Sequence, residues 1–172
     1  MDRAIDAREM DVTLAGRVAA EPGGERIWRC FACGTCTASC PVAEVTERYN
    51  PRRIIHMVLL GLTTEVLTSE FIWLCSTCYA CYERCPQDVR ITELMHAIKN
   101  VAVREGHVHP SFRAQVGLIR DHGRLYDITG FENERRAELG LPALAEQPEE
   151  YQQILAATGI EALVQPAEGG AE

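Results

Sequence analysis

Eight cysteines lie in two runs of identical spacing, and the chain contains no others. They are Cys30, Cys33, Cys36 and Cys40 in the first run, and Cys75, Cys78, Cys81 and Cys85 in the second. Both runs read C-x2-C-x2-C-x3-C-P, the spacing with which bacterial ferredoxins bind two [4Fe–4S] clusters through thiolates. Three thiolates at two-residue intervals can wrap three corners of one cubane, because the backbone between them turns toward the cluster.

The fourth cysteine of each run lies one residue further along and is followed by proline. In this pattern it reaches the other cluster, so the spacing predicts crossed ligation. The predicted ligands are Cys30, Cys33, Cys36 and Cys85 for the first cluster, and Cys75, Cys78, Cys81 and Cys40 for the second.

Two other uses of eight cysteines fit the sequence less well. Structural zinc is usually bound by two separated C-x2-C pairs, without a third cysteine at the same two-residue interval and without a following proline. A disulfide framework needs an oxidising compartment, whereas residues 1–6 are charged from the start and lead into no apolar segment of a signal peptide. We therefore expect a cytoplasmic chain that holds two [4Fe–4S] clusters.

The overall composition excludes two classes of partner. The net charge is −8 and the pI about 5.2, and no basic stripe is present, so we expect no binding to nucleic acid. The most apolar stretch, residues 57–62, is far too short to span a bilayer, so no transmembrane segment is expected. A chain of 172 residues has room for one domain with extensions.

The segment between the two runs is predicted to be helical, unlike the β-structure that joins the runs of small bacterial ferredoxins. Asn50 and Pro51 form a favourable N-cap and first helical residue. Apolar residues then recur at helical spacing, at Ile54, Ile55, Val58, Leu59 and Leu62. A second short helix is expected to start at Thr68 and to run through residue 74.

A constant offset of 45 residues relates the two runs, which indicates an internal duplication with helical connectors. After the second run, Thr92 is expected to cap a helix over residues 93–104. Pro110 opens a further helix that ends at Gly123, and two short helices are predicted near residues 132–139 and 148–157. The predicted fold class is therefore all-α, with two cluster-binding turns.

The sequence divides into three parts. Residues 1–25 are expected to form an N-terminal arm, and residues 26–123 a helical domain that holds both clusters. Residues 124–172 form an extension that we interpret as a partner-binding arm, with a disordered tail at 165–172. The alternative interpretation is that this extension only enlarges the domain and binds no partner.

Residues 30–141 resemble the C subunit of heterodisulfide reductase and its relatives. The resemblance is carried by CGTCT at 33–37, CP at 40–41, NPRRII at 50–55 and CSTCYACYERCP at 75–86. It implies the α-helical ferredoxin fold, which also occurs in the iron–sulfur subunits of succinate dehydrogenase and fumarate reductase.

The resemblance also implies a role. In that family the C subunit passes electrons between a flavin-containing A subunit and a catalytic B subunit, which reduces a disulfide at non-cubane clusters. The present chain has neither the Cys-Cys pair found in B subunits nor a G-x-G-x-x-G stretch. All eight thiolates are assigned to iron, which leaves none as a nucleophile. We therefore expect an electron-transfer subunit of a hetero-oligomer, without catalytic residues of its own.

Two other functions stay open. The chain could be the iron–sulfur subunit of another oxidoreductase, either a quinone-linked dehydrogenase or a sulfur-oxidising heterodisulfide-reductase-like system. The chains that co-purify with it would distinguish these cases. A cluster-bearing sensor or structural module is less favoured, because neither a basic recognition helix nor an unpaired cluster ligand is visible.

Several residues near the cysteines are candidates for tuning the clusters. A guanidinium near an anionic cluster favours the reduced state; the arginines concerned are Arg29, Arg52, Arg53, Arg84 and Arg90. Trp28 and Phe31 could shield an edge of the first cluster, and Tyr79 and Tyr82 could shape the exit for electrons. Each of these residues could equally be an ordinary packed or solvated side chain.

Overall fold

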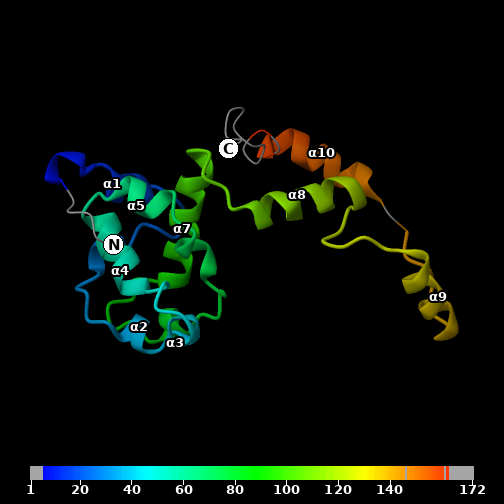
Figure 1. Cartoon of the computed structure of the whole chain (residues 1–172), viewed down its shortest axis with the longest axis horizontal. Coiled ribbons are helices and arrows are strands. Elements are labelled where there is room, and N and C mark those ends of the chain that lie inside the picture. Colours follow the sequence, from blue (N-terminus) through cyan, green and yellow to red (C-terminus); the bar gives the residue numbers. More distant parts are fainter. Residues whose placement is uncertain (1–5, 146, 161, 163–172) are drawn as a thin grey trace. The chain divides into compact units, whose positions relative to one another are not determined.

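The computed structural model describes residues 6–145, 147–160 and 162, and within these ranges the chain forms helices without strands (Figure 1). The predicted all-α class is confirmed. The chain divides into two compact units, Met1–His107 and Val108–Glu172. In the described ranges, no helix has both the length and the apolar character needed to cross a bilayer.

The first unit contains both cysteine runs. Its 3-10 helices (η) and α-helices are, in chain order, η1 (Ala7–Glu9), α1 (Leu14–Ala19), η2 (Ile27–Arg29), α2 (Thr35–Ala38), α3 (Pro41–Val45), α4 (Pro51–Leu59), α5 (Thr63–Leu67), η3 (Phe71–Leu74), α6 (Ala80–Glu83) and α7 (Ile91–Arg104). Within this unit α2 and α3 lie at one end and α1 and α5 at the other, with α7 extending between them (Figure 1).

Helices α4 and α7 supply much of the core of this unit. As predicted, Asn50 caps α4: its side chain accepts a hydrogen bond from the Arg53 N–H at 2.9 Å, and Pro51 occupies the first turn. All five buried residues of α4 have a buried counterpart in α7 at an offset of 40, and α7 also buries Thr92, Val101 and Ala102. The matching residues are Pro51, Ile54, Ile55, Met57 and Val58 in α4, and Ile91, Leu94, Met95, Ala97 and Ile98 in α7.

The internal duplication is visible in the backbone. Helices α2 and α6 are offset by 45 residues, the same offset that relates the cysteines. Ile27 and Ile72 occupy matching positions before each run, and both are completely buried. The two halves therefore share a short 3-10 turn, a cysteine turn and a following core helix.

The N-terminal segment packs into the first unit. Leu14, Ala15 and Val18 of α1 are buried. The Asp11 N–H donates to the Gly61 carbonyl at 2.8 Å, and a Cβ at Gly61 would lie 2.3 Å from the Asp11 carbonyl oxygen. This close approach, with φ of +74° at Gly61, requires glycine. The compact unit thus differs from the expected domain: it includes part of segment 1–25 and ends at His107 instead of residue 123.

Two predicted helix starts differ from the structure. The helix expected from Thr68 is the 3-10 turn η3, and it is preceded by α5, whose start at Leu62 has no side-chain cap that the sequence would reveal. Helix α7 begins at Ile91, because Arg90 adopts a left-handed conformation with φ of +59°. Thr92 therefore lies inside the helix and does not cap it.

The second unit contains α8 (Pro110–His122), α9 (Gly130–Glu138) and α10 (Pro148–Thr158). Helix α8 ends at Gly123, as predicted, and packs against α10, where the Gln152 side chain donates to the Arg120 carbonyl at 3.0 Å. Leu155 is the buried residue of these three helices. The predicted disordered tail lies outside the described residues.

Candidate iron–sulfur centres

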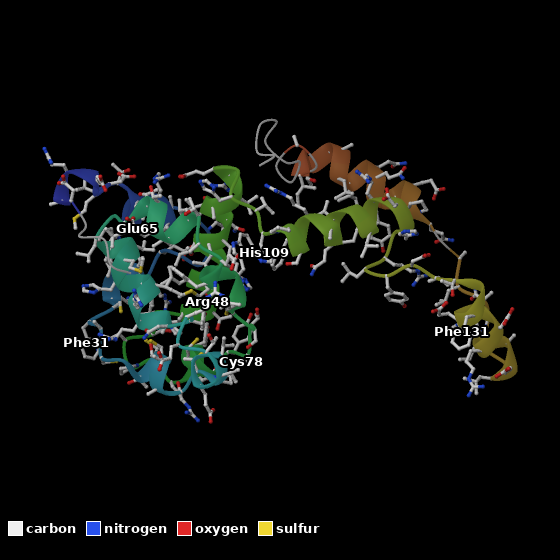
Figure 2. The ribbon with its side chains drawn as sticks, viewed as in Figure 1. Phe31, Arg48, Glu65, Cys78, His109 and Phe131 are labelled. Carbon is white, nitrogen blue, oxygen red and sulfur yellow. The ribbon has the colours of Figure 1, made fainter. Side chains whose placement is uncertain are left out.

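The eight cysteines line two cavities of the first unit. The first cavity is lined by Cys30, Cys33, Cys36 and Cys85, and the second by Cys40, Cys75, Cys78 and Cys81. Each cavity takes three cysteines from one run and the last cysteine of the other, which are the two sets that the spacing predicts. Figure 2 labels Phe31 of the first lining and Cys78 of the second.

Each run folds as a turn with left-handed residues on both sides of its second cysteine. In the first run these are Ala32 and Gly34, with φ of 60° and 88°, and in the second run Thr77 and Tyr79, with φ of 56° and 62°. The left-handed conformation costs residues other than glycine roughly 1–2 kcal/mol each. All five such residues of the described chain lie in the segments around the cavities: Ala32, Thr77, Tyr79, Asp88 and Arg90. Strain of this kind concentrates at functional sites.

The four cysteines of a cavity differ in exposure. Cys36 in α2 and Cys81 in α6 are buried, whereas Cys33 and Cys78 are exposed. Each cavity is therefore enclosed on the side of its short helix and open toward solvent beside its second cysteine.

The chemistry of the donor set fits iron–sulfur clusters. Burial raises the pKa of Cys36 to about 11 and also raises the pKa of Cys81, whereas a hydrogen bond with Thr35 lowers the pKa of Cys33. A coordinated metal binds the thiolate and displaces its proton, so burial does not prevent ligation. Among the described residues no three Cys, His, Asp or Glu side chains converge as around a single metal ion, an arrangement that a cubane with four separate irons does not require.

Polar groups approach two sulfur atoms of the first cavity. The Val89 N–H donates to Cys85 Sγ at 3.4 Å, and Thr35 Oγ1 lies 3.4 Å from Cys33 Sγ. Hydrogen bonds to the sulfurs are among the factors that set the reduction potential of a cluster.

Polar side chains also approach two sulfur atoms of the second cavity. Thr92 Oγ1 lies 3.7 Å from Cys81 Sγ, and Thr92 is 1% exposed. Tyr49 is 2% exposed, and its pKa is raised first by burial and then by the hydrogen bond that its hydroxyl donates to Cys75. The residues that contact these ligands thus include side chains from outside both cysteine runs.

Two of the four aromatic residues singled out in the sequence line the cavities. Phe31 lines the first cavity and is 61% exposed, and Tyr79 lines the second. Trp28 is 62% exposed and does not line either cavity, so the expectation that it shields a cluster edge is not met. Tyr82 packs beside Tyr79, with 5.7 Å between the ring centroids.

Among the five candidate arginines, Arg52 lines the first cavity. Arg29 and Arg90 instead face Asp88, at N···O distances of 3.8 and 3.7 Å. Arg53 and Arg84 line other surface hollows. One arginine of the five is therefore in position to act on a cavity directly.

Comparisons with known proteins agree with this geometry. Residues 26–89, which contain both runs, match the family described as a 4Fe-4S dicluster domain. The iron-sulfur C subunit 2 of the CoB--CoM heterodisulfide reductase of Methanocaldococcus jannaschii is 41% identical over 134 residues, which cover 77% of this chain and 71% of that protein. The chain belongs to the family of heterodisulfide reductase C subunits.

Two further members of this family are also similar to the chain over most of its length. The C subunit of the H(2):CoB-CoM heterodisulfide,ferredoxin reductase of Methanothermobacter thermautotrophicus is 36% identical over 149 residues, or 83% of this chain and 80% of that protein. The C subunit of the Ferredoxin:CoB-CoM heterodisulfide reductase of Methanosarcina mazei is 36% identical over 132 residues, or 77% and 81%. As a member of this family, the chain is an iron–sulfur electron-transfer subunit with two [4Fe–4S] clusters.

Tyr49 and Thr92 contact predicted cluster ligands, a role that was not predicted from the sequence. Tyr49 directly precedes the N-cap Asn50, where an apolar or aromatic residue often packs against the first turns of a helix. That pattern predicts burial of Tyr49, but it does not predict contact with Cys75, which lies 26 residues further along the chain.

Proposed function

We propose that this chain relays electrons between a flavin-containing A-type subunit and a catalytic B-type subunit that reduces a disulfide at non-cubane clusters. The observation that supports this most directly is the presence of two four-cysteine cavities in one compact unit. The names of the relatives, which are C subunits of heterodisulfide reductases, support the same role.

The proposal includes crossed ligation. Cys30, Cys33, Cys36 and Cys85 hold the first cluster, and Cys75, Cys78, Cys81 and Cys40 hold the second. When bound, each cluster can accept and release an electron. The protein holds the thiolates in place, keeps the sides at Cys36 and Cys81 away from water, and leaves the sides at Cys33 and Cys78 open to partners. We place the chain in the cytoplasm, where thiols stay reduced and available to iron.

Anaerobic purification of the native complex tests this function. We expect about eight irons in this chain, as two cubanes require, together with a flavin-containing subunit and a subunit with adjacent cysteines. Zinc in place of iron would contradict the cluster assignment. Eight irons with a quinone-reactive partner would contradict the heterodisulfide reductase role and support the alternative of another oxidoreductase.

We also propose that residues 124–172 bind a partner subunit. The described part of this extension exposes several large apolar side chains, and extensive exposed apolar surface often marks a site of protein–protein contact. They are Leu125, Tyr126, Phe131, Leu139, Leu141, Tyr151 and Ile154, of which Phe131 is 71% exposed. Leu155 is the single buried residue of α9 and α10, so these residues are not needed for a core.

Substitution of two exposed residues tests this role. The double variant Phe131→Ser with Leu139→Ser is expected to weaken association with the other subunits by tenfold or more, because buried aromatic anchors dominate interfaces. Glu134→Ser in α9 is the matched control, since Glu134 is also exposed. Affinity measured with the purified partner subunits should change in the double variant alone. Equal affinities of the native chain and both variants would contradict the role of this extension.

A further inference from the structure

Because of the internal duplication, the residues around one cavity can be compared with those at equivalent positions around the other. Helices α4 and α7 match at an offset of 40, so Tyr49 before α4 corresponds to Val89 before α7. Both residues are buried, at 2% and 1% exposed. Tyr49 lines the second cavity and Val89 lines the first. The same structural position therefore carries a phenol at one centre and an apolar side chain at the other.

The Tyr49 hydroxyl is directed at a predicted ligand of the second cluster. It donates a hydrogen bond to Cys75, in a setting from which water is largely excluded. A donor to a cluster sulfur stabilises the reduced state, because the added electron increases the negative charge on the sulfurs. The low dielectric of a buried site strengthens this effect. Val89 has no side-chain donor to offer the first cluster, and its backbone N–H serves Cys85 instead.

The first cavity has compensating groups, but they are closer to water. Arg52 lines it, yet Arg52 is exposed, so solvent and salt screen its charge. Thr35 contacts Cys33, which is itself exposed. The second cavity instead has a hydroxyl contact between Thr92 and Cys81, which are both buried.

We propose that Tyr49 holds the second cluster at a higher reduction potential than the first. The inference rests on the crossed ligation proposed above. Tyr49 is a positioning residue that acts on the cluster through Cys75. At equilibrium, a single electron in the reduced chain would then reside mainly on the second centre, so transfer from the first centre to the second would be favourable.

Potentiometric titration of the anaerobic full-length chain, followed by EPR, tests this proposal. The signal of the second centre is assigned with Cys78→Ser, which alters one exposed ligand of that cavity. In the native chain this centre should have the higher potential. Tyr49→Phe should shift its reduction equilibrium about tenfold toward the oxidised state, a fall of about 59 mV for one electron, and leave the first centre unchanged.

Tyr82→Phe is the matched control. It also removes a phenol hydroxyl, but from a residue of the second cysteine run that lines neither cavity. An unchanged potential of the second centre in Tyr49→Phe would overturn the proposal, as would a lower potential of that centre in the native chain. Iron and sulfide content separates these results from a failure of the ligation. The proposal on potentials is judged on variants that retain all eight irons. Loss of iron from both centres in Cys78→Ser would instead contradict the ligand sets themselves.

Discussion

At the scale of single residues, the cysteine turns depend on backbone conformations that most side chains resist. Gly34 has φ of +88°, and its counterpart Tyr79 has φ of +62°. The duplication therefore keeps the same left-handed conformation with two different residues. At Gly34 the conformational cost is avoided, whereas at Tyr79 it is offset by the surrounding structure.

Gly34→Ala should lower the free energy of unfolding of the first unit by about 1–2 kcal/mol, from the left-handed conformation alone. Steric clash does not contribute, since the nearest atom to an added Cβ would be Arg52 Cδ at 3.8 Å. Gly16→Ala is the control: Gly16 lies in α1, where an added Cβ meets no atom within 4 Å. That change should stabilise the unit by up to about 1 kcal/mol. Anaerobic urea unfolding measures both, and a stabilising effect of Gly34→Ala would contradict the role of the turn.

At the scale of elements, local signals predicted some helices well and others poorly. The start of α4 followed from Asn50-Pro51, and both ends of α8 followed from Pro110 and Gly123, because caps and breakers act locally. The starts of α5 and α7 were missed, because Leu62 has no capping side chain and Arg90 is held in a left-handed conformation by its tertiary setting. The spacing groups the cysteines in the same way as the two cavities do, whereas Tyr49 and Thr92 reach the second cavity through the packing of α4 and α7, which no local pattern encodes.

Helix α7 contributes to both cavities, with Ile91 at the first and Thr92 at the second. Ile98 is completely buried in the same helix, and Ile98→Ala should cost about 2–5 kcal/mol in stability. Because one helix supports both sites, iron should be lost from both centres together when the variant is challenged with a chelator. His96→Ala, at an exposed position of α7, should behave like the native chain. Selective loss from one centre in Ile98→Ala would contradict this coupling.

At the scale of the whole molecule, the chain combines a cluster-binding unit with a second unit that has little core. The first unit is small, and many of its segments are short turns around the cysteines. Domains of this size often depend on metal ligation for stability, since the unfolded chain cannot offer a preformed site. The helices of the second unit contain no cysteine and should be independent of iron.

Removal of iron should therefore loosen the first unit and spare the second. Amide hydrogen exchange is expected to accelerate by at least tenfold in α2, α4, α6 and α7 after anaerobic chelation. Exchange in α8 and α10 should be unchanged, which provides an internal control. Unaltered protection throughout the first unit would contradict the view that the clusters stabilise it.

The most direct test of the central claim is a comparison of four cysteine variants by EPR and iron analysis of the reduced protein. Crossed ligation predicts that Cys85→Ala resembles Cys33→Ala, with damage to the first cluster. It also predicts that Cys40→Ala resembles Cys78→Ala, with damage to the second. If Cys85→Ala instead resembles Cys78→Ala, and Cys40→Ala resembles Cys33→Ala, each run holds its own cluster and crossed ligation is wrong.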